Sequence, residues 1–167
     1  MPTRSDQFLI TEKLLLQHRG LEEYLSIDES MIPYNGKHYA KQFIRGKPIH
    51  FGFKMWALCS KYGFLHWFGL YLGKNVTDGR ERSERNVGLG CNVVLKLIEK
   101  ASVPRDQGHK VYFDNYFTSI QLIEDCQKKN CASGTCRENR TTKCPMPSKS
   151  ESKKFQRGYT TSEQLTI

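Results

Sequence analysis

Two aspartates each follow a short apolar run of the sequence. Asp28 follows residues 25–27 (LSI), and Asp114 follows residues 111–113 (VYF). Such runs predict buried strands, and a carboxylate at a strand exit is held in a fixed place at the surface. If the two strands are neighbours, both carboxylates lie within reach of one pair of Mg²⁺ or Mn²⁺ ions. Carboxylate oxygens around two such ions are what phosphoryl transfer requires.

Each aspartate on its own also has a simpler interpretation. Asp is common where a strand ends in a turn or where a helix is capped. Asp28 leads into the polar pair Glu29 and Ser30, and Asp114 stands shortly before Thr118, which is predicted to open a helix. Only the two aspartates together predict a metal site.

A basic stretch lies between Glu29 and Asp78, where no acidic and seven basic residues occur. Because cations neutralise phosphates, we predict DNA contacts for five of them: Lys37, Lys41, Arg45, Lys47 and Lys54. The interleaved aromatic residues Tyr34, Tyr39, Phe43, Phe51 and Trp56 either share this DNA-facing surface or lie in the core of a hairpin, and strand alternation favours the core. In the alternative interpretation the lysines are the solvated face of that hairpin.

The whole chain is basic, with a net charge of +9 over 167 residues. This balance favours nucleic acid as a partner over an anionic membrane surface. No apolar run of about 18 residues predicts a membrane span, and the first twenty residues do not resemble a signal peptide. We therefore expect a reducing compartment, the cytosol or the nucleus, and mostly free thiols for the six cysteines. The spacing of Cys126, Cys131, Cys136 and Cys144 does not favour a zinc site.

Hydrophobic periodicity predicts an α/β protein. The expected elements are a lead-in helix (5–20), a strand (22–28), a hairpin (51–59 and 64–72), a helix (92–101), a strand (110–114), a helix ending near 129 and a short strand (131–137). A capping box, Thr118 to Gln121, is predicted to open the last helix. The expected domain limits are 1–20 for the lead-in, 21–137 for the folded domain and 138–167 for a basic, flexible tail.

Three motifs carry a family resemblance: SIDE at 26–29, GKP at 46–48 and DNYFTS at 114–119. Together, over roughly residues 20–145, they resemble the transposase domain of piggyBac-type DNA transposons and of the host genes descended from them. The resemblance implies a partial ribonuclease-H-like fold with a mixed sheet and flanking helices. It also implies that Asp28 and Asp114 hold catalytic Mg²⁺, that DNA is the substrate, and that the protein is nuclear.

One family feature is missing from the 167 residues. A further catalytic aspartate of the family stands in a Gly-Gly-Val-Asp-like stretch, which this sequence does not contain. We therefore expect a DNA-binding remnant of a DDD-type cut-and-paste transposase that is inactive alone. The alternatives are a non-catalytic nucleic-acid-binding or protein-interaction module, or a fragment of a longer active transposase. The sequence leaves a homodimer open.

Overall fold

A computed structural model describes residues 10–11, 13–15, 17, 20–73, 88–128, 131–140, 147 and 149–160. The expected lead-in helix falls mainly outside these residues, although residues 10–11, 13–15 and 17 are helical. The strands are β1 (Tyr24–Pro33), β2 (Gln42–Phe43), β3 (Phe51–Ser60), β4 (Leu65–Leu70), β5 (Lys110–Phe113) and β6 (Cys131–Gly134). The helices are α2 (Leu89–Lys100), α3 (Ile120–Gln127), the 3₁₀ turn η1 (Glu138–Arg140) and α4 (Lys149–Ser152).

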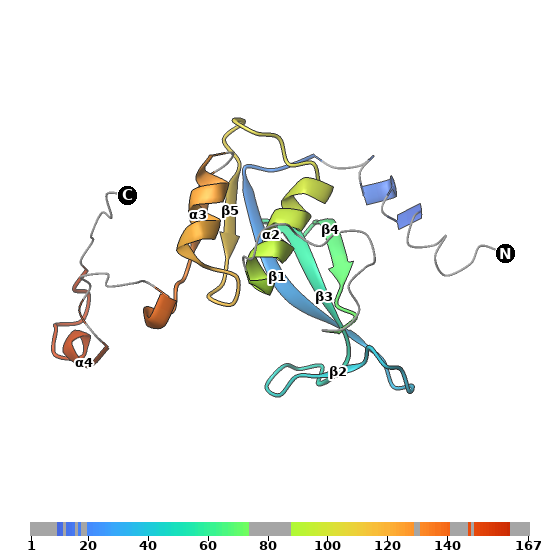
Figure 1. Ribbon diagram of the computed structural model, residues 1–167, viewed down its shortest axis with the longest axis horizontal. Helices are drawn as coiled ribbons and strands as arrows, with labels where there is room; N and C mark the ends of the chain where they lie inside the picture. The colour runs from blue at the N-terminus through green and yellow to red at the C-terminus, as the bar shows by residue number, and fades with distance from the viewer. Residues whose placement is uncertain are drawn as a thin grey trace.

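The six strands form one mixed sheet with the order β2-β3-β1-β5-β6, and β4 also pairs with β3 (Figure 1). β1 runs antiparallel to β3 and parallel to β5, and β5 runs parallel to β6. The expected hairpin is present as the antiparallel pair β3 and β4. The α/β mixed sheet that the sequence predicted is confirmed.

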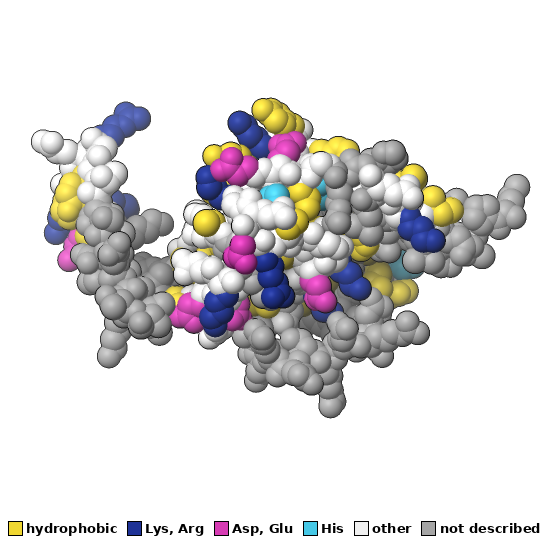
Figure 2. Space-filling view, turned by 90° about the horizontal axis from the view of Figure 1, so that it is seen from above, with side chains coloured by type: hydrophobic (Ala, Val, Ile, Leu, Met, Phe, Trp, Pro, Cys, Tyr) yellow, Lys and Arg dark blue, Asp and Glu magenta, His cyan; other side chains and the backbone are white. Residues whose placement is uncertain are grey.

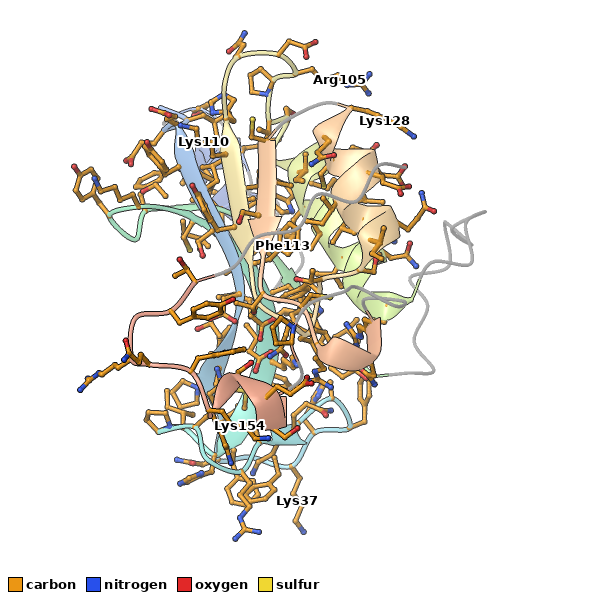
Figure 3. All side chains as sticks on the ribbon, turned by 90° about the vertical axis from the view of Figure 1, so that its left-hand side faces the viewer. Lys37, Arg105, Lys110, Phe113, Lys128 and Lys154 are labelled. Atoms are coloured by element: carbon orange, nitrogen blue, oxygen red, sulfur yellow. The ribbon has the colours of Figure 1, made fainter. Side chains whose placement is uncertain are left out.

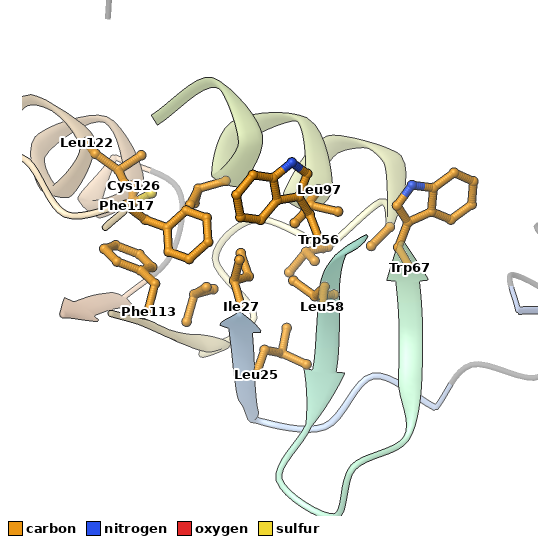
Figure 4. Close-up of a cluster of buried hydrophobic side chains, with 14 of the residues drawn as sticks. Leu25, Ile27, Trp56, Leu58, Trp67, Leu97, Phe113, Phe117, Leu122 and Cys126 are labelled. Atoms are coloured by element: carbon orange, nitrogen blue, oxygen red, sulfur yellow. The ribbon is translucent and has the colours of Figure 1, made fainter. Parts of the chain in front are cut away.

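The core lies between one face of this sheet and helices α2 and α3 (Figure 4). Along β1, Leu25 and Ile27 point into the core while the residues next to them are exposed, as strand alternation requires. α2 presents Cys91, Val94 and Leu97 at helical spacing. Figure 3 shows the sheet from its edge, with both helices on the same side. No described helix has the length and apolar character to cross a membrane.

β3 contributes two large side chains to the core, Trp56 and Leu58. Their neighbours Met55 and Ala57 lie on the other face, opposite Ser30 and Asp28 of β1. β3 is a central strand because β1 pairs with one of its edges while β2 and β4 share the other. Among the described strands, β3 alone pairs with β1 beyond Ile27.

A core truncation in β3 tests this packing. Leu58 is fully buried, so Leu58→Ala is expected to lower the free energy of unfolding by about 2–5 kcal/mol, because it removes apolar contacts and leaves a cavity. Urea denaturation followed by circular dichroism measures the loss. Tyr62→Ala, at a side chain 81% exposed in the β3–β4 turn, is the control and should change stability by less than about 0.5 kcal/mol. Equal losses in both variants would contradict the packing.

Candidate metal site and basic arm

Asp28 lies in the middle of β1 and not at its end, which corrects the predicted strand exit. β1 continues for five residues beyond Asp28, to Pro33, because β3 still pairs with it there. The parallel pairing with β5 is what ends at this point, since the last pair is Ile27 with Phe113. Asp28 is the first residue of β1 beyond β5, and its side chain is exposed.

Asp114 directly follows β5 and opens a turn. Its Oδ1 accepts a hydrogen bond from the backbone N–H of Tyr116 at 2.9 Å. Its carbonyl oxygen accepts bonds from the backbone N–H groups of Phe117 and Thr118 and from the Thr118 hydroxyl. The predicted capping box is one residue out of place: Ser119 is the N-cap of α3, and its Oγ accepts from Leu122 N–H at 3.2 Å.

The parallel register brings the two aspartates together. Each follows one member of the pair Ile27 and Phe113, and neighbouring strands lie about 4.8 Å apart. One oxygen of each carboxylate is occupied by a nearby backbone N–H, from Glu29 at 2.7 Å for Asp28 and from Tyr116 for Asp114. No bond to another described residue engages the second oxygen of either. The remaining oxygens of these two exposed side chains, one on β1 and one directly after β5, fit part of a Mg²⁺ coordination sphere, which usually also contains water.

The carboxylate set is incomplete in the described part of the chain. No group of three or more His, Cys, Asp or Glu side chains is arranged there to hold a metal ion. Glu29 is the next carboxylate after Asp28 in the sequence, but it forms ion pairs with two lysines. Its Oε1 lies 3.5 Å from Lys47 Nζ, and its Oε2 lies 3.4 Å from Lys54 Nζ.

Lys54 belongs to the interior of the site. Its side chain is 15% exposed, and its Nζ lies 4.0 Å from the centre of the Trp56 ring and 5.0 Å from that of Tyr116. The two rings stack on each other with centroids 5.5 Å apart. Lys54 therefore ties Glu29, next to Asp28, to the turn that follows Asp114. Burial, then the neighbouring Tyr71 and Glu29, raise the pKa of the Tyr116 hydroxyl.

Two arginines from beyond β6 support the turn after Asp114. Arg140 Nη1 donates to three backbone carbonyls, those of Asn115 at 3.0 Å, Tyr116 at 3.2 Å and Thr118 at 3.0 Å. Arg137 Nε donates to Asn115 Oδ1 at 3.2 Å. These bonds satisfy carbonyls that the turn itself leaves unpaired. Arg140 fixes the turn, and no local pattern in the sequence points to this role.

Helix α2 closes the same turn from the other side. A Cβ placed on Gly90, in the first turn of α2, would lie 2.8 Å from the carbonyl oxygen of Tyr116. Only glycine lets the helix approach the turn this closely. The position of Asp114 is thus set by α2, by η1 and by its own backbone bonds.

Cys59 lies on the same face of the sheet as Asp28. Its strand neighbour is Ser26, and Asp28 pairs with Ala57. Burial raises the pKa of the half-buried Cys59 thiol, and the negative charge of Asp28 raises it further. The five described cysteines are free thiols, as expected.

The basic stretch forms an arm, residues 34–51, that projects from the sheet at β2 (Figure 1). Lys37 and Arg45 are exposed and form no ion pair with another described residue. Lys41 is half-buried, donates to the carbonyl of Gly36 at 3.2 Å and lies 5.2 Å from the Phe51 ring centre. Of the five residues predicted to contact DNA, Lys47 and Lys54 are held by Glu29.

Comparisons with known proteins agree on one family. The family model described as Transposase IS4 matches residues 15–165. The human PiggyBac transposable element-derived protein 3 is 38% identical over 138 residues, which is 82% of this chain and 23% of that protein. The human PiggyBac transposable element-derived protein 2 is 35% identical over 162 residues, which is 92% of this chain and 27% of that protein.

A solved structure shares the fold. The chain matches a piggyBac transposase in a cryo-EM structure of a synaptic complex with hairpin DNA, with a TM-score of 0.68 and 26% identity. The match covers 96% of this chain and 31% of that one. The chain thus spans about a quarter of the length of these curated relatives.

Replacing Arg140 tests its support of the Asp114 turn. Arg140→Met keeps the length of the side chain and removes three hydrogen bonds, so we expect a loss of about 1–3 kcal/mol in the free energy of unfolding. Urea denaturation measures it. Arg137→Met removes a single exposed bond and should cost less than about 0.5 kcal/mol. If the two variants unfold at the same urea concentration, Arg140 does not hold the turn.

The thiol of Cys59 reports the charge of Asp28. In Asp28→Asn the negative charge is gone, so the thiolate is less disfavoured, the pKa of Cys59 falls, and alkylation by iodoacetamide at pH 8 becomes faster. The measurement uses a background in which the other five cysteines are replaced by serine or alanine. Glu99→Gln, which changes a carboxylate on α2, is the control and should leave the rate unchanged. An unchanged alkylation rate in Asp28→Asn would show that the charge of Asp28 does not affect the Cys59 thiol.

Proposed function

Because the chain belongs to the piggyBac-type (IS4) transposase family, we propose that it is a transposase-derived DNA-binding domain that keeps two carboxylates of a metal site. Asp28 and Asp114 hold the divalent metal, and the arm residues Lys37, Lys41 and Arg45 contact DNA. The observation that carries the proposal is the register of β1 and β5, which sets the two aspartates side by side.

Each part of the proposal has its own support. Transposases of this type generally use divalent metal ions, and the solved relative is a complex with hairpin DNA. When bound, such an ion neutralises charge on the phosphate that is transferred. In this chain Asp28 and Asp114 each offer one exposed oxygen to it, while Arg140 and Gly90 keep the Asp114 turn in place.

We do not expect these 167 residues to transfer DNA strands by themselves. Two carboxylates bind a metal pair weakly, and Glu29, the next carboxylate along β1, is neutralised by Lys47 and Lys54. DNA binding in the nucleus is therefore the main proposed activity, and a homodimer is part of this proposal only as a source of a further carboxylate. The second candidate is a binding module without catalysis, which the incomplete carboxylate set among the described residues favours.

Salt-dependent binding of duplex DNA tests the DNA-contacting role of the arm. Removing one phosphate contact should weaken binding to any sequence and lower the slope of log K against log salt by about one. We expect this for Lys37→Ala and Arg45→Ala in fluorescence anisotropy over 50–200 mM NaCl. Lys110→Ala, whose partner is Glu23 at the opposite end of the sheet, is the matched control. Slopes that do not differ among the three variants would refute the role of the arm.

Metal-dependent nicking tests the two aspartates. Supercoiled DNA is incubated with the chain and Mn²⁺, beside Asp28→Asn and Asp114→Asn. We expect no nicking above background, with DNA binding retained in all three proteins. Nicking that requires the metal and disappears in both variants would instead show a working active site and overturn the view that the chain is inactive alone.

A further inference from the structure

The arm exposes aromatic rings that the sequence predicts to be buried. The side chain of Tyr39 is 71% exposed, that of Phe43 59% and that of Phe51 54%. The prediction that these three lie in a hairpin core is wrong. β2 pairs with β3 at only two positions, Gln42 with Gly52 and Phe43 with Phe51, and the three rings remain exposed beside the strands and helices that the structure describes.

The exposed rings are held in place. Phe43 and Phe51 face each other across the short ladder with centroids 4.8 Å apart, and Lys41 Nζ lies 5.2 Å from the Phe51 ring centre. Tyr39 stacks on His38 at 4.5 Å, and His38 in turn contacts Phe53 at the base of the arm. Rings fixed in this way lose little conformational freedom when they bind a ligand.

The charged residues of the arm are all basic. Residues 34–51 include four Lys and Arg residues and no Asp or Glu. The ion pair of Lys47 with Glu29 anchors the arm to β1, whereas Lys37, at the tip of the molecule in Figure 3, and Arg45 remain exposed. The opposite end of the sheet differs, because acidic and basic side chains are interspersed there (Figure 2).

We propose that the arm binds DNA with unpaired bases, which stack on Phe43 and Tyr39 while Lys37, Lys41 and Arg45 neutralise the flanking phosphates. The proposal rests on the proposed DNA-binding function and narrows its substrate. Bases inside a duplex are stacked on each other and present no face to a protein ring. A single strand offers both the faces and the phosphates that the arm combines, and a base stacked on an aromatic side chain adds substantially to affinity.

A second protein chain is the competing occupant of this surface. A protein partner would use the same aromatic rings, but it would also meet Lys37, Lys41 and Arg45 with no acidic residue in the arm, which would require a strongly acidic partner. Self-association is disfavoured by the same charges, because two copies of the arm would bring like charges together. Charge complementarity therefore selects nucleic acid.

The test compares a fluorescein-labelled 20-nucleotide oligo-dT with a 20-base-pair duplex at the same salt concentration. The variants are Phe43→Leu, which keeps apolar bulk but lacks a stacking face, Phe43→Trp, which keeps that face, and Tyr62→Ala as a control at a remote exposed ring. We expect Phe43→Leu to weaken single-strand binding roughly tenfold and duplex binding less than twofold. Phe43→Trp should retain single-strand binding, and the emission of the introduced indole should be quenched by the oligonucleotide. Tyr62→Ala should match the original chain.

Several outcomes would overturn the proposal, and they differ from failure of the proposed function. If the chain binds duplex DNA in a salt-dependent way but Phe43→Leu changes nothing, the stacking proposal alone fails. Equal losses on both DNAs, or an unquenched indole, also reject stacking. If the original chain binds neither DNA, DNA binding and stacking fail together. If Phe43→Leu abolishes a dimer in sedimentation velocity while DNA binding is unchanged, the rings serve self-association.

Discussion

The parallel pairing of β1 with β5 is the constraint on which the rest of the structure depends. Leu25 and Ile27 of β1 and Val111 and Phe113 of β5 enter one core beneath α2 and α3. No turn joins the two strands, so their register is held by the burial of these side chains and by the ladder between them. A shift of one residue would turn the apolar side chains away from the core and separate the two aspartates.

Ion pairs within the domain hold several of its basic side chains in place. Glu29 lies between Lys47 and Lys54, and Lys54 also contacts the stacked rings of Trp56 and Tyr116. This network joins the arm, β1 and the Asp114 turn into one unit. It also divides the basic residues into those that support the fold and those, such as Lys37 and Arg45, that remain available to a partner.

The turn after Asp114 is held by contacts from segments that are distant in the sequence. Its carbonyls point to Arg140, its N–H groups point back to Asp114, and Gly90 of α2 leaves room for it. Each contact comes from a different part of the chain. These contacts hold the turn, and with it the position of Asp114 directly after β5.

By itself the sequence determined the order of most strands and helices, the mixed α/β class and the family, and it predicts Asp28 and Asp114 as metal ligands. These features depend on local periodicity and on short motifs, which can be read without knowing which strands pair. Only the tertiary structure decided that Asp28 lies within a longer strand, that Ser119 and not Thr118 caps α3, and that Glu29 neutralises two predicted DNA contacts. It also decided that Arg140 holds the turn and that Phe43 and Phe51 are exposed. These outcomes depend on contacts between residues far apart in the chain, and local sequence patterns do not encode which distant groups will meet.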